Sequence, residues 1–485
     1  MASRDLRSWI AQLEAEGELI RVRAKVDWDG EISQIIKKVY AKQGPALLFE
    51  NIKDHETTWS TTLFTNGLGT TARWSLMLGL PRETPVGEII KIIKNRIKEP
   101  IKPIRVSSGP VKENIIKGKD VDLFQFPVPK WHPLDNGRYI NTFFGAVTKD
   151  PDTGQNNVGI YRGTILSKNK IGVLLIPMKD WGITYLKYKE MGKPMPVAFV
   201  YGWDPTLLAV GGSPYRGHEY GLAGAMRQEA IELVKCETSD IEVPASAEIV
   251  VEGTISPDTS TYEIEGPFGE GSGFYGEERE RPVVDVSCIT YRNNPIFRGS
   301  LVGTGLPEEL SMLGHISISA AVWDVLDSQE IPGVLDVIVG FPTVVKIHKT
   351  YQGQPRQVAA AIWGSKFAGQ IYNVIVVVED DVDIHNPGAV WHAVTSQANF
   401  NRDLVVYPLY MGSPVDPSIP FEKRNELKWG AGIQYKLLID ATIDWEVYPE
   451  REEWGNRRQP PLCNNQKPAI EELVGRRWKE YNIGI

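Results

Sequence analysis

Glu265 and Glu270, two glutamates five residues apart, are the residues whose types and spacing most directly suggest chemistry. Pro267, flanked by Gly266 and Gly269, separates them, and this composition is typical of a tight turn. Such a turn can bring both carboxyl groups toward one pocket, where their repulsion raises the pKa of one and suits it to general acid or base work. The spacing alone favours this interpretation no more than a surface turn with two solvated glutamates.

Arg162 is a candidate partner for these carboxylates, and it stands five residues after Asn157 in the segment NVGIYR. An arginine in a pocket can bind a carboxylate through two parallel hydrogen bonds. The small-residue loop GGSPY, residues 211–215, is suited to holding a phosphate through backbone N–H groups, and Glu248 opens a predicted strand after a small-residue loop. Taken singly, each of these features is better explained by an ordinary strand end or surface turn.

The composition indicates a globular protein of several domains. A chain of 485 residues, 42% hydrophobic and 24% charged, predicts two to four domains. A net charge of −8 argues against a nucleic-acid partner. The cysteines, Cys236, Cys288 and Cys463, are too far apart for a metal motif and fit a reducing, cytoplasmic setting. We find no signal peptide and no run of ~18 apolar residues, so we expect no membrane partner.

The elements that must position these residues begin with an N-terminal region of mixed pattern. Residues 1–115 alternate helical and strand periodicity, which predicts an α/β domain whose first helix is capped by Ser3. A linker with three prolines follows at residues 99–110. Helices are predicted at 3–16, 32–40, 72–78 and 87–98, and strands at 19–26 and 45–49.

Short strands with frequent turns then dominate residues 116–310, which is typical of a β-barrel-like domain. Its predicted strands are 141–148, 159–166, 171–176, 197–201, 247–254, 283–291 and 296–301, with helices at 185–191 and 222–228. From residue 311 helices and strands alternate, which predicts a second α/β domain over 311–485 with a polar C-terminal tail. It contains helices at 316–327, 356–363, 390–395 and 469–481, and strands at 334–339, 343–347 and an apolar, doubly buried 374–378.

In their order along the chain, the motifs resemble those of the UbiD-like decarboxylases, which use prenylated flavin mononucleotide. The resemblance covers nearly the whole sequence and rests on GPALLFENIK, NVGIYR, VKCETSDIEVPASAEIVVEG, EGPFGE, VVVEDDVD and YKLLIDAT. It implies an N-terminal α/β domain at 1–115, a central split β-barrel that holds the flavin at 116–310, and a C-terminal α/β oligomerisation domain at 311–485.

The resemblance also implies roles for individual residues. Arg162, Glu265 and Glu270 match the catalytic arginine and glutamates of the family. The family holds the flavin phosphate through a divalent metal, usually manganese, with potassium nearby, and Asn157 and Glu248 match two of the metal ligands. The residues implied around the flavin are Asn157, Ile160, Tyr161, Arg162, Met178, Lys179, Ser213, Pro214, Glu248 and Lys436.

The third metal ligand of the family, a histidine, has no counterpart in this sequence. Counting from Arg162 without gaps places Asp180 at its position, and one gap places Lys179 there. Asp180 would complete an oxygen-only set that suits manganese or magnesium, whereas a lysine would place a fixed cation beside the phosphate. We expect Asp180 to be the ligand.

The function implied by the resemblance is reversible, non-oxidative decarboxylation or carboxylation of an aromatic or α,β-unsaturated carboxylic acid. The stretches VDWDGE, GRYINT and KDPDTG look most like the branch that includes phenylphosphate carboxylase. Implied partners are the acid, carbon dioxide, a flavin prenyltransferase that supplies the cofactor, and further copies of the chain in a dimer or hexamer. Two alternatives are a split-barrel flavin reductase and a non-catalytic subunit of a larger carboxylase; neither needs the arginine and both glutamates.

Overall fold

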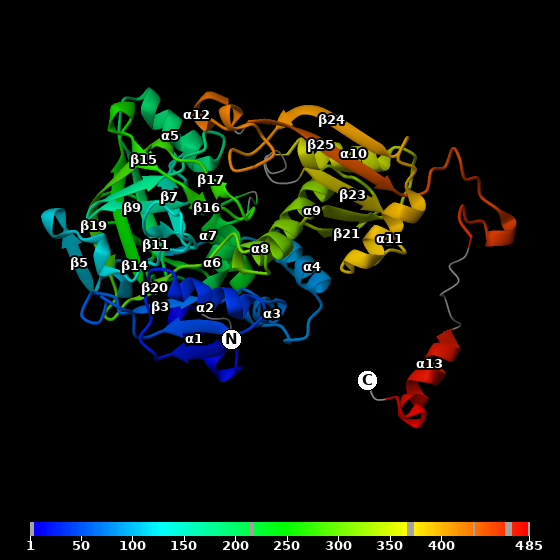
Figure 1. Ribbon diagram of the computed structural model, residues 1–485, viewed down its shortest axis with the longest axis horizontal. Coiled ribbons are helices and arrows are strands. Elements are labelled where there is room, and N and C mark those ends of the chain that lie inside the picture. The colour runs from blue at the N-terminus through cyan, green and yellow to red at the C-terminus, as the bar shows by residue number, and fades with distance from the viewer. Residues whose placement is uncertain are drawn as a thin grey trace.

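A computed structural model describes residues 4–213, 215, 217–365, 373–429, 432–460 and 468–483. The N-terminal elements and the central sheet pack against one another, and the C-terminal sheet lies beyond them (Figure 1). The predicted fold class, two α/β domains around a β-rich one, is confirmed. No helix within the described ranges is long and apolar enough to cross a membrane.

The N-terminal domain begins with α1 (Leu6–Ala15), whose Leu6, Trp9, Ile10 and Leu13 recur at helical spacing and are buried. Each such side chain contributes roughly 1.5–3 kcal/mol on burial. Asp5 caps this helix, whereas Ser3 lies outside the described residues. The other elements are β1 (Leu19–Val22), α2 (Glu31–Tyr40), β2 (Ala46–Phe49), β3 (Thr62–Thr65), α3 (Thr71–Met77) and α4 (Val86–Arg96). The sheet order is β1-β2-β3-β20, so β20 (Ile296–Arg298) returns from the central region to complete it.

The central domain is a curled half-barrel built on a nine-stranded sheet. Its order is β6-β9-β10-β19-β14-β11-β7-β8, with β5 paired to β19. The strands are β5 (Asn114–Lys117), β6 (Tyr139–Asn141), β7 (Gly145–Lys149), β8 (Asn156–Gly159), β9 (Gly163–Ser167), β10 (Lys170–Val173), β11 (Met195–Tyr201), β14 (Ile249–Ile255) and β19 (Val283–Tyr291). Helices α5 (Asp180–Glu190), α6 (Pro205–Gly211) and α7 (Glu219–Arg227) accompany them, and β13 (Glu242–Pro244), β12 (Glu232–Lys235) and β4 (Ile104–Arg105) form a separate small sheet.

The predicted strand at 159–166 is confirmed at 163–166, which lie in β9 (Gly163–Ser167), but it is interrupted at 160–162. There the chain leaves one end of the sheet and joins the other. β8 pairs with β7, whereas β9 pairs with β6 and β10. Only Ile160, Tyr161 and Arg162 connect β8 to β9. A connection this short requires the two ends of the sheet to curl toward each other. The curl therefore places Arg162 where the sheet ends meet.

The C-terminal domain opens with α8 (Glu309–Leu313), which runs through a π-helical turn (Gly314–Ile318) into α9 (Ser319–Ser328). Its five-stranded sheet has the order β21-β22-β23-β25-β24. The strands are β21 (Val334–Ile338), β22 (Thr343–Ile347), β23 (Val374–Val378), β24 (Leu404–Met411) and β25 (Ile433–Ala441), flanked by α10 (Gln354–Trp363) and α11 (Pro387–Gln397). β23 lies centrally and is buried, as its apolar sequence predicted, whereas β24 and β25 were not predicted.

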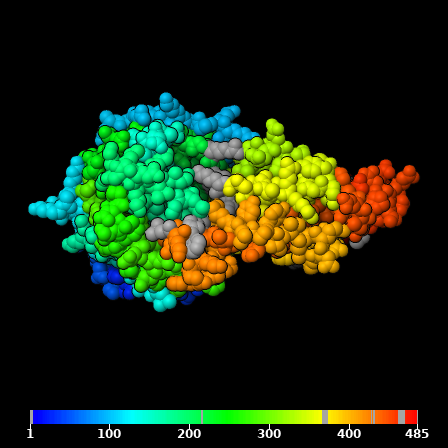
Figure 2. Space-filling model, turned by 90° about the horizontal axis from the view of Figure 1, so that it is seen from above, coloured from blue at the N-terminus to red at the C-terminus, as the bar shows by residue number. Residues whose placement is uncertain are grey.

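Two parts of the C-terminal region leave this sheet. Residues 412–429, here called the return segment, end in α12 (Glu426–Trp429) and lie against the central domain (Figure 2). The last helix, α13 (Pro468–Arg477), extends away from the body (Figure 1). Short 3-10 turns occur at Pro110–Lys112, Gly118–Asp120, Leu123–Gln125, Thr259–Thr261, Phe421–Lys423, Glu452–Trp454 and Trp478–Tyr481.

Candidate active site

The two glutamates lie on two nested strand pairs, one enclosed in sequence by the other. Glu265 ends β15 (Glu263–Glu265), which pairs with β18 (Arg279–Arg281), and Glu270 follows β16 (Phe268–Gly269), which pairs with β17 (Tyr275–Gly276). Gly266 between them has a φ of +93°, and a Cβ added there would lie 2.2 Å from the backbone oxygen of Glu277. Only glycine fits this turn, so the predicted tight turn is confirmed.

Arg162 lies between the two carboxylates. Its Nε and Nη2 donate to Oε1 and Oε2 of Glu265 at 3.0 and 2.7 Å, and its Nη1 donates to Oε1 of Glu270. The side chains of Glu265 and Glu270 are 0% and 13% exposed. The alternative of a surface turn with two solvated glutamates is therefore wrong.

The two carboxyl groups have opposite pKa shifts. Burial raises the pKa of Glu265, but the charges of Arg162 and Arg281 and a hydrogen bond from the Tyr139 hydroxyl at 2.8 Å outweigh it, so the net pKa is lowered. Burial raises the pKa of Glu270, Arg162 opposes this, and the charge of Glu265 adds to it, so the net pKa is raised. One carboxyl is thus held ionised and the other is inclined to keep a proton, which is the arrangement of a positioned anion beside a general acid.

A glycine-rich loop covers the backbone of Glu270. Gly303 has a φ of +74°, and a Cβ added there would lie 2.2 Å from the carbonyl oxygen of Glu270. The N–H of Gly303 donates to Oε1 of Glu308 at 3.1 Å, and Glu308 is the N-cap of α8. The start of the C-terminal domain therefore holds the loop that packs on Glu270.

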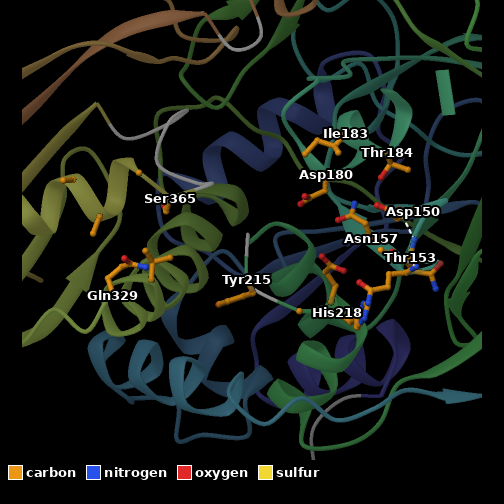
Figure 3. Close-up of a pocket in the computed structure, with 18 residues that line it drawn as sticks. Asp150, Thr153, Asn157, Asp180, Ile183, Thr184, Tyr215, His218, Gln329 and Ser365 are labelled. Carbon is orange, nitrogen blue, oxygen red and sulfur yellow. Dashed lines mark hydrogen bonds between the residues drawn. The ribbon is translucent and has the colours of Figure 1, made fainter. Parts of the chain in front are cut away.

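A cavity of about 670 Å³ opens between the central and C-terminal domains. Asn157, Asp180 and Thr184 face it from the central domain, and Gln329 and Ser365 face it from the opposite side (Figure 3). Its other lining residues are Asp150, Thr153, Gln155, Asn156, Ile183, Tyr215, Gly217, His218, Glu219, Val325, Ala360, Ala361 and Gly364. Arg162, Glu265 and Glu270, here called the trio, are not among these lining residues. The short connection after β8 joins Asn157 of the lining to Arg162 of the trio.

The structure does not place Glu248 with Asn157 and Asp180. Its buried carboxylate accepts hydrogen bonds from Arg7 Nε and Nη2 at 2.9 and 3.0 Å, from Arg292 Nη1 at 3.3 Å and from the N–H of Ile296 at 3.1 Å. These donors tie the N-terminal helix to the central sheet and occupy both carboxylate oxygens. The assignment of Glu248 as a metal ligand is therefore corrected: it is a structural anion at a domain contact.

Besides Asp150, which pairs with Lys187 Nζ at 2.7 Å, the further carboxylate that lines the cavity with Asn157 and Asp180 is Glu219. It is the first residue of α7, four residues after the end of the predicted small-residue loop 211–215. The sequence offered one signal for Glu219, an acidic residue at the start of a helix that follows a loop suited to phosphate binding. This signal was missed because the helix was predicted to begin only at residue 222. Asp180 lines the cavity as the first residue of α5, whereas Lys179 is its N-cap residue and is not part of the lining.

The remaining residues predicted around a flavin are spread over two domains. Tyr161 stacks on Trp181 with ring centroids 4.2 Å apart, and Ile160 is partly buried between the two hydrophobic cores. Met178 is partly buried in the turn before α5. Lys436 is buried in β25, where its Nζ donates to Gln434 Oε1 at 2.8 Å and Asn373 Oδ1 at 3.1 Å, and burial lowers its pKa to about 8. Pro214 lies outside the described residues.

The donor set around the cavity fits a phosphate group with a divalent cation. Asp180, Glu219 and Asn157 supply carboxylate and amide oxygens, the ligands that magnesium and manganese prefer. Within the described residues, no three or more His, Cys, Asp or Glu side chains are grouped as a metal site, so the amide of Asn157 and a ligand oxygen would have to complete the shell. The buried Nδ2 of Asn157 and Oγ of Ser213 have no hydrogen-bond partner in the described part of the chain. Buried polar atoms are normally hydrogen-bonded, so this is expected of atoms that bind a ligand.

Family models of 3-octaprenyl-4-hydroxybenzoate carboxy-lyase match the chain in three consecutive parts. The N-terminal domain matches residues 10–93, the Rift-related domain residues 102–305 and the C-terminal domain residues 311–441. A protein of Synechocystis sp., sll0936, is 30% identical over 511 residues, which cover 99% of this chain and 97% of that protein.

Solved structures extend this similarity to three dimensions. Vanillic acid decarboxylase from Sedimentibacter hydroxybenzoicus, in its closed form, is 28% identical with a TM-score of 0.87 over 99% of each chain. The UbiD-class enzyme HmfF from Pelotomaculum thermopropionicum, in complex with FMN, is 29% identical with a TM-score of 0.81 over 96% of this chain and 98% of its own. An evolved dimeric HmfF in complex with prFMN is 28% identical with a TM-score of 0.78 over 97% and 98%. The chain belongs to the UbiD family of carboxy-lyases.

Proposed function

We propose that this protein catalyses the reversible, non-oxidative decarboxylation of an aromatic or α,β-unsaturated carboxylic acid with prenylated FMN as its cofactor. The observation that carries the proposal is the buried arrangement of Arg162 between Glu265 and Glu270. The solved relatives support it, since they include a vanillic acid decarboxylase and a UbiD-class enzyme in complex with prFMN.

The cavity residues would hold the phosphate end of the flavin. Asn157, Asp180 and Glu219 would hold manganese or magnesium, with potassium nearby. Ser213, whose buried Oγ has no partner in the described residues, would donate to the phosphate. When bound, the prenylated flavin supplies the electron sink that no side chain can provide for an aryl carbanion. The resemblance also implies Ile160, Tyr161 and Lys436 as flavin neighbours.

The trio would bind the substrate and move the proton. Arg162 would orient the substrate carboxylate, and Glu265 would keep Arg162 in place through its two parallel hydrogen bonds. Glu270 would hold a proton on its carboxyl group and deliver it to the carbon that loses carbon dioxide. The raised pKa of Glu270, caused mainly by burial, keeps that proton available near neutral pH.

The intact trio favours this proposal over the two alternatives. A flavin reductase has no need for a buried arginine between two glutamates. A non-catalytic subunit is expected to lack at least one of these three residues. Assembly into a dimer or larger homo-oligomer fits the exposed apolar side chains of α13 and its neighbouring turn, among them Ile470, Leu473 and Trp478. We propose a cytoplasmic enzyme of the branch that includes phenylphosphate carboxylase.

The test is full-length protein produced with and without a flavin prenyltransferase, compared by absorbance spectrum and by turnover of a panel of aromatic and α,β-unsaturated acids. We expect the modified flavin spectrum and decarboxylation only after co-production. An Arg162→Lys control keeps the charge but lacks the planar fork, so it should retain the flavin and lose turnover. A protein that holds the modified flavin but neither decarboxylates nor exchanges product hydrogen for deuterium in heavy water would refute the proposal.

A further inference from the structure

The return segment carries a buried carboxylate from the C-terminal domain into the layer behind the catalytic trio. Its helix α12 lies beside the central domain, away from the sheet to which the segment is connected (Figure 1). Glu426, at the start of α12, is 2% exposed, and its Oε1 accepts a hydrogen bond from Arg281 Nε at 2.8 Å. Burying a charge this completely is costly unless it is paired, so the Arg281 contact is the reason that Glu426 can lie there.

Arg281 is in turn bonded to the trio. Its Nη1 donates to Glu265 Oε2 at 2.5 Å, to the backbone oxygen of Glu265 at 3.2 Å and to that of Glu277 at 2.9 Å. Arg281 is 3% exposed, so it is shared between a carboxylate of the central domain and one of the C-terminal domain. A continuous chain of charged contacts therefore runs from Glu426 through Arg281 and Glu265 to Arg162.

Two further contacts fix the return segment at this place. The Arg424 guanidinium lies 3.5 Å from Glu277 Oε1, and the Arg279 guanidinium lies over the Phe421 ring, 5.3 Å from its centroid. Arg279 Nη2 also donates to the backbone oxygen of Phe421 at 3.3 Å. The approach of α12 to the hairpin of Glu265 is thus supported by contacts of the residues that precede Glu426.

We propose that Glu426 is a positioning residue through which the C-terminal domain holds Arg281 against Glu265 and balances the charge around Glu270. This inference rests on the proposed function for the role of Glu270. Glu426 does not touch Arg162 or Glu270 in this arrangement; it acts through Arg281 alone.

The charge count explains why a distant carboxylate matters to a proton donor. Arg162 and Arg281 carry two positive charges, and Glu265 and Glu426 carry two negative ones, so the buried group is neutral when Glu270 is protonated. Removing the charge of Glu426 leaves one uncompensated positive charge, which favours the ionised form of Glu270. The other charged or titratable groups around Glu270 are Tyr139, Asp135, His132, Tyr275, Glu277 with Arg279 and Arg424, and Glu308, and a substitution at Glu426 leaves all of them in place.

The test compares Glu426→Gln with Glu422→Gln, an exposed glutamate of the same segment, in full-length protein loaded with the prenylated flavin. We expect Glu426→Gln to lower kcat roughly tenfold with little change in KM, the scale seen when a residue behind a catalytic group is lost. The alkaline limb of its kcat profile should move to lower pH by about one pH unit, since Glu270 loses its proton more easily. Glu426→Asp keeps the charge and should restore the pH profile, and Glu422→Gln should match the wild type.

A double variant and hydrogen exchange complete the test. Because Glu426 acts through Arg281, Arg281→Gln should be as impaired alone as together with Glu426→Gln. Amide hydrogen exchange of residues 275–281, measured without substrate, should be faster in Glu426→Gln than in Glu422→Gln. Unchanged exchange and an unmoved pH profile in Glu426→Gln, or multiplying effects in the double variant, would overturn the inference. Faster exchange in a protein with no decarboxylase activity would instead refute the proposed function and leave the positioning contact standing.

Discussion

Glu308 is a buried carboxyl group whose ionisation should control the stability of the protein near neutral pH. It is 3% exposed, its Oε1 accepts the N–H of Gly303, and its Oε2 has no partner in the described part of the chain. Burial raises its pKa from 4.5 to about 8, and the charge of neighbouring Glu309 adds to this. Substituting Glu308 by glutamine keeps the shape and the acceptor for Gly303 but removes the ionisation.

The size and sign of the effect follow from proton linkage. Between pH 4.5 and about 8 the folded protein keeps a proton on Glu308 that the unfolded chain releases. The free energy of unfolding of the wild type therefore falls as pH rises through this interval. At about 1.4 kcal/mol for each pKa unit, the full interval corresponds to roughly 5 kcal/mol, lost completely once the pH exceeds the folded pKa.

Glu308→Gln should consequently match the wild type at about pH 4.5 and exceed it in stability by on the order of 5 kcal/mol above pH 8. The measurement is urea unfolding of both proteins across this pH range, with the exposed Glu422→Gln as the control that keeps the wild-type dependence. The difference between Glu308→Gln and the wild type is the quantity of interest, because other titrating groups contribute equally to both. Unfolding free energies that stay parallel at all pH values would refute the assignment of a raised pKa to Glu308.

Glu270→Gln should keep the fold and the flavin but lose ~10²–10⁴-fold in turnover, because the amide has no acidic proton. If this variant still exchanges product hydrogen for deuterium in heavy water at the wild-type rate, another group is the proton donor. Asp180→Ala should lower flavin and metal content together, and flavin retention equal to the wild type would exclude Asp180 as a ligand. Glu248→Gln should leave flavin and metal content unchanged and cost about 1–3 kcal/mol of stability through its contact with the 38% exposed Arg7, as measured by denaturation and elemental analysis. Light scattering at micromolar concentration should give at least a dimer, and a monomer would contradict the role assigned to α13.

The turn at Glu265 could be predicted because its conformation is set locally. Pro267 and the positive φ of Gly266 leave few alternatives for the chain, so residue types alone indicate where it reverses. The strands at 343–347 and 374–378 were also predicted with the bounds that the structure has, since short apolar runs between turn residues have few other uses. Local signals were therefore sufficient for elements that depend on their own sequence.

The failures concern features that depend on distant parts of the chain. The division of the predicted strand at 159–166 depends on which sheet neighbours β8 and β9 acquire, and the environment of Glu248 depends on Arg7, more than two hundred residues away in sequence. Buried glutamates that bind a metal and those that pair with an arginine have the same local sequence pattern. Only the tertiary contacts distinguish Glu248 from Glu219.

The trio of Arg162, Glu265 and Glu270 depends on contacts from all three domains. The sheet curl of the central domain brings Arg162 to Glu265, and α8, whose Glu309 binds Arg298 and the N–H groups of Asn66 and Leu68, fixes the loop behind Glu270 to the N-terminal domain. The return segment, which connects β24 to β25, adds a carboxylate from the C-terminal domain. In the proposed mechanism, a movement of the C-terminal domain that separates Glu426 from Arg281 would therefore also change the pKa of Glu270, the proposed proton donor. The position of the C-terminal domain would in this way affect proton transfer by Glu270 through the charges of Glu426 and Arg281.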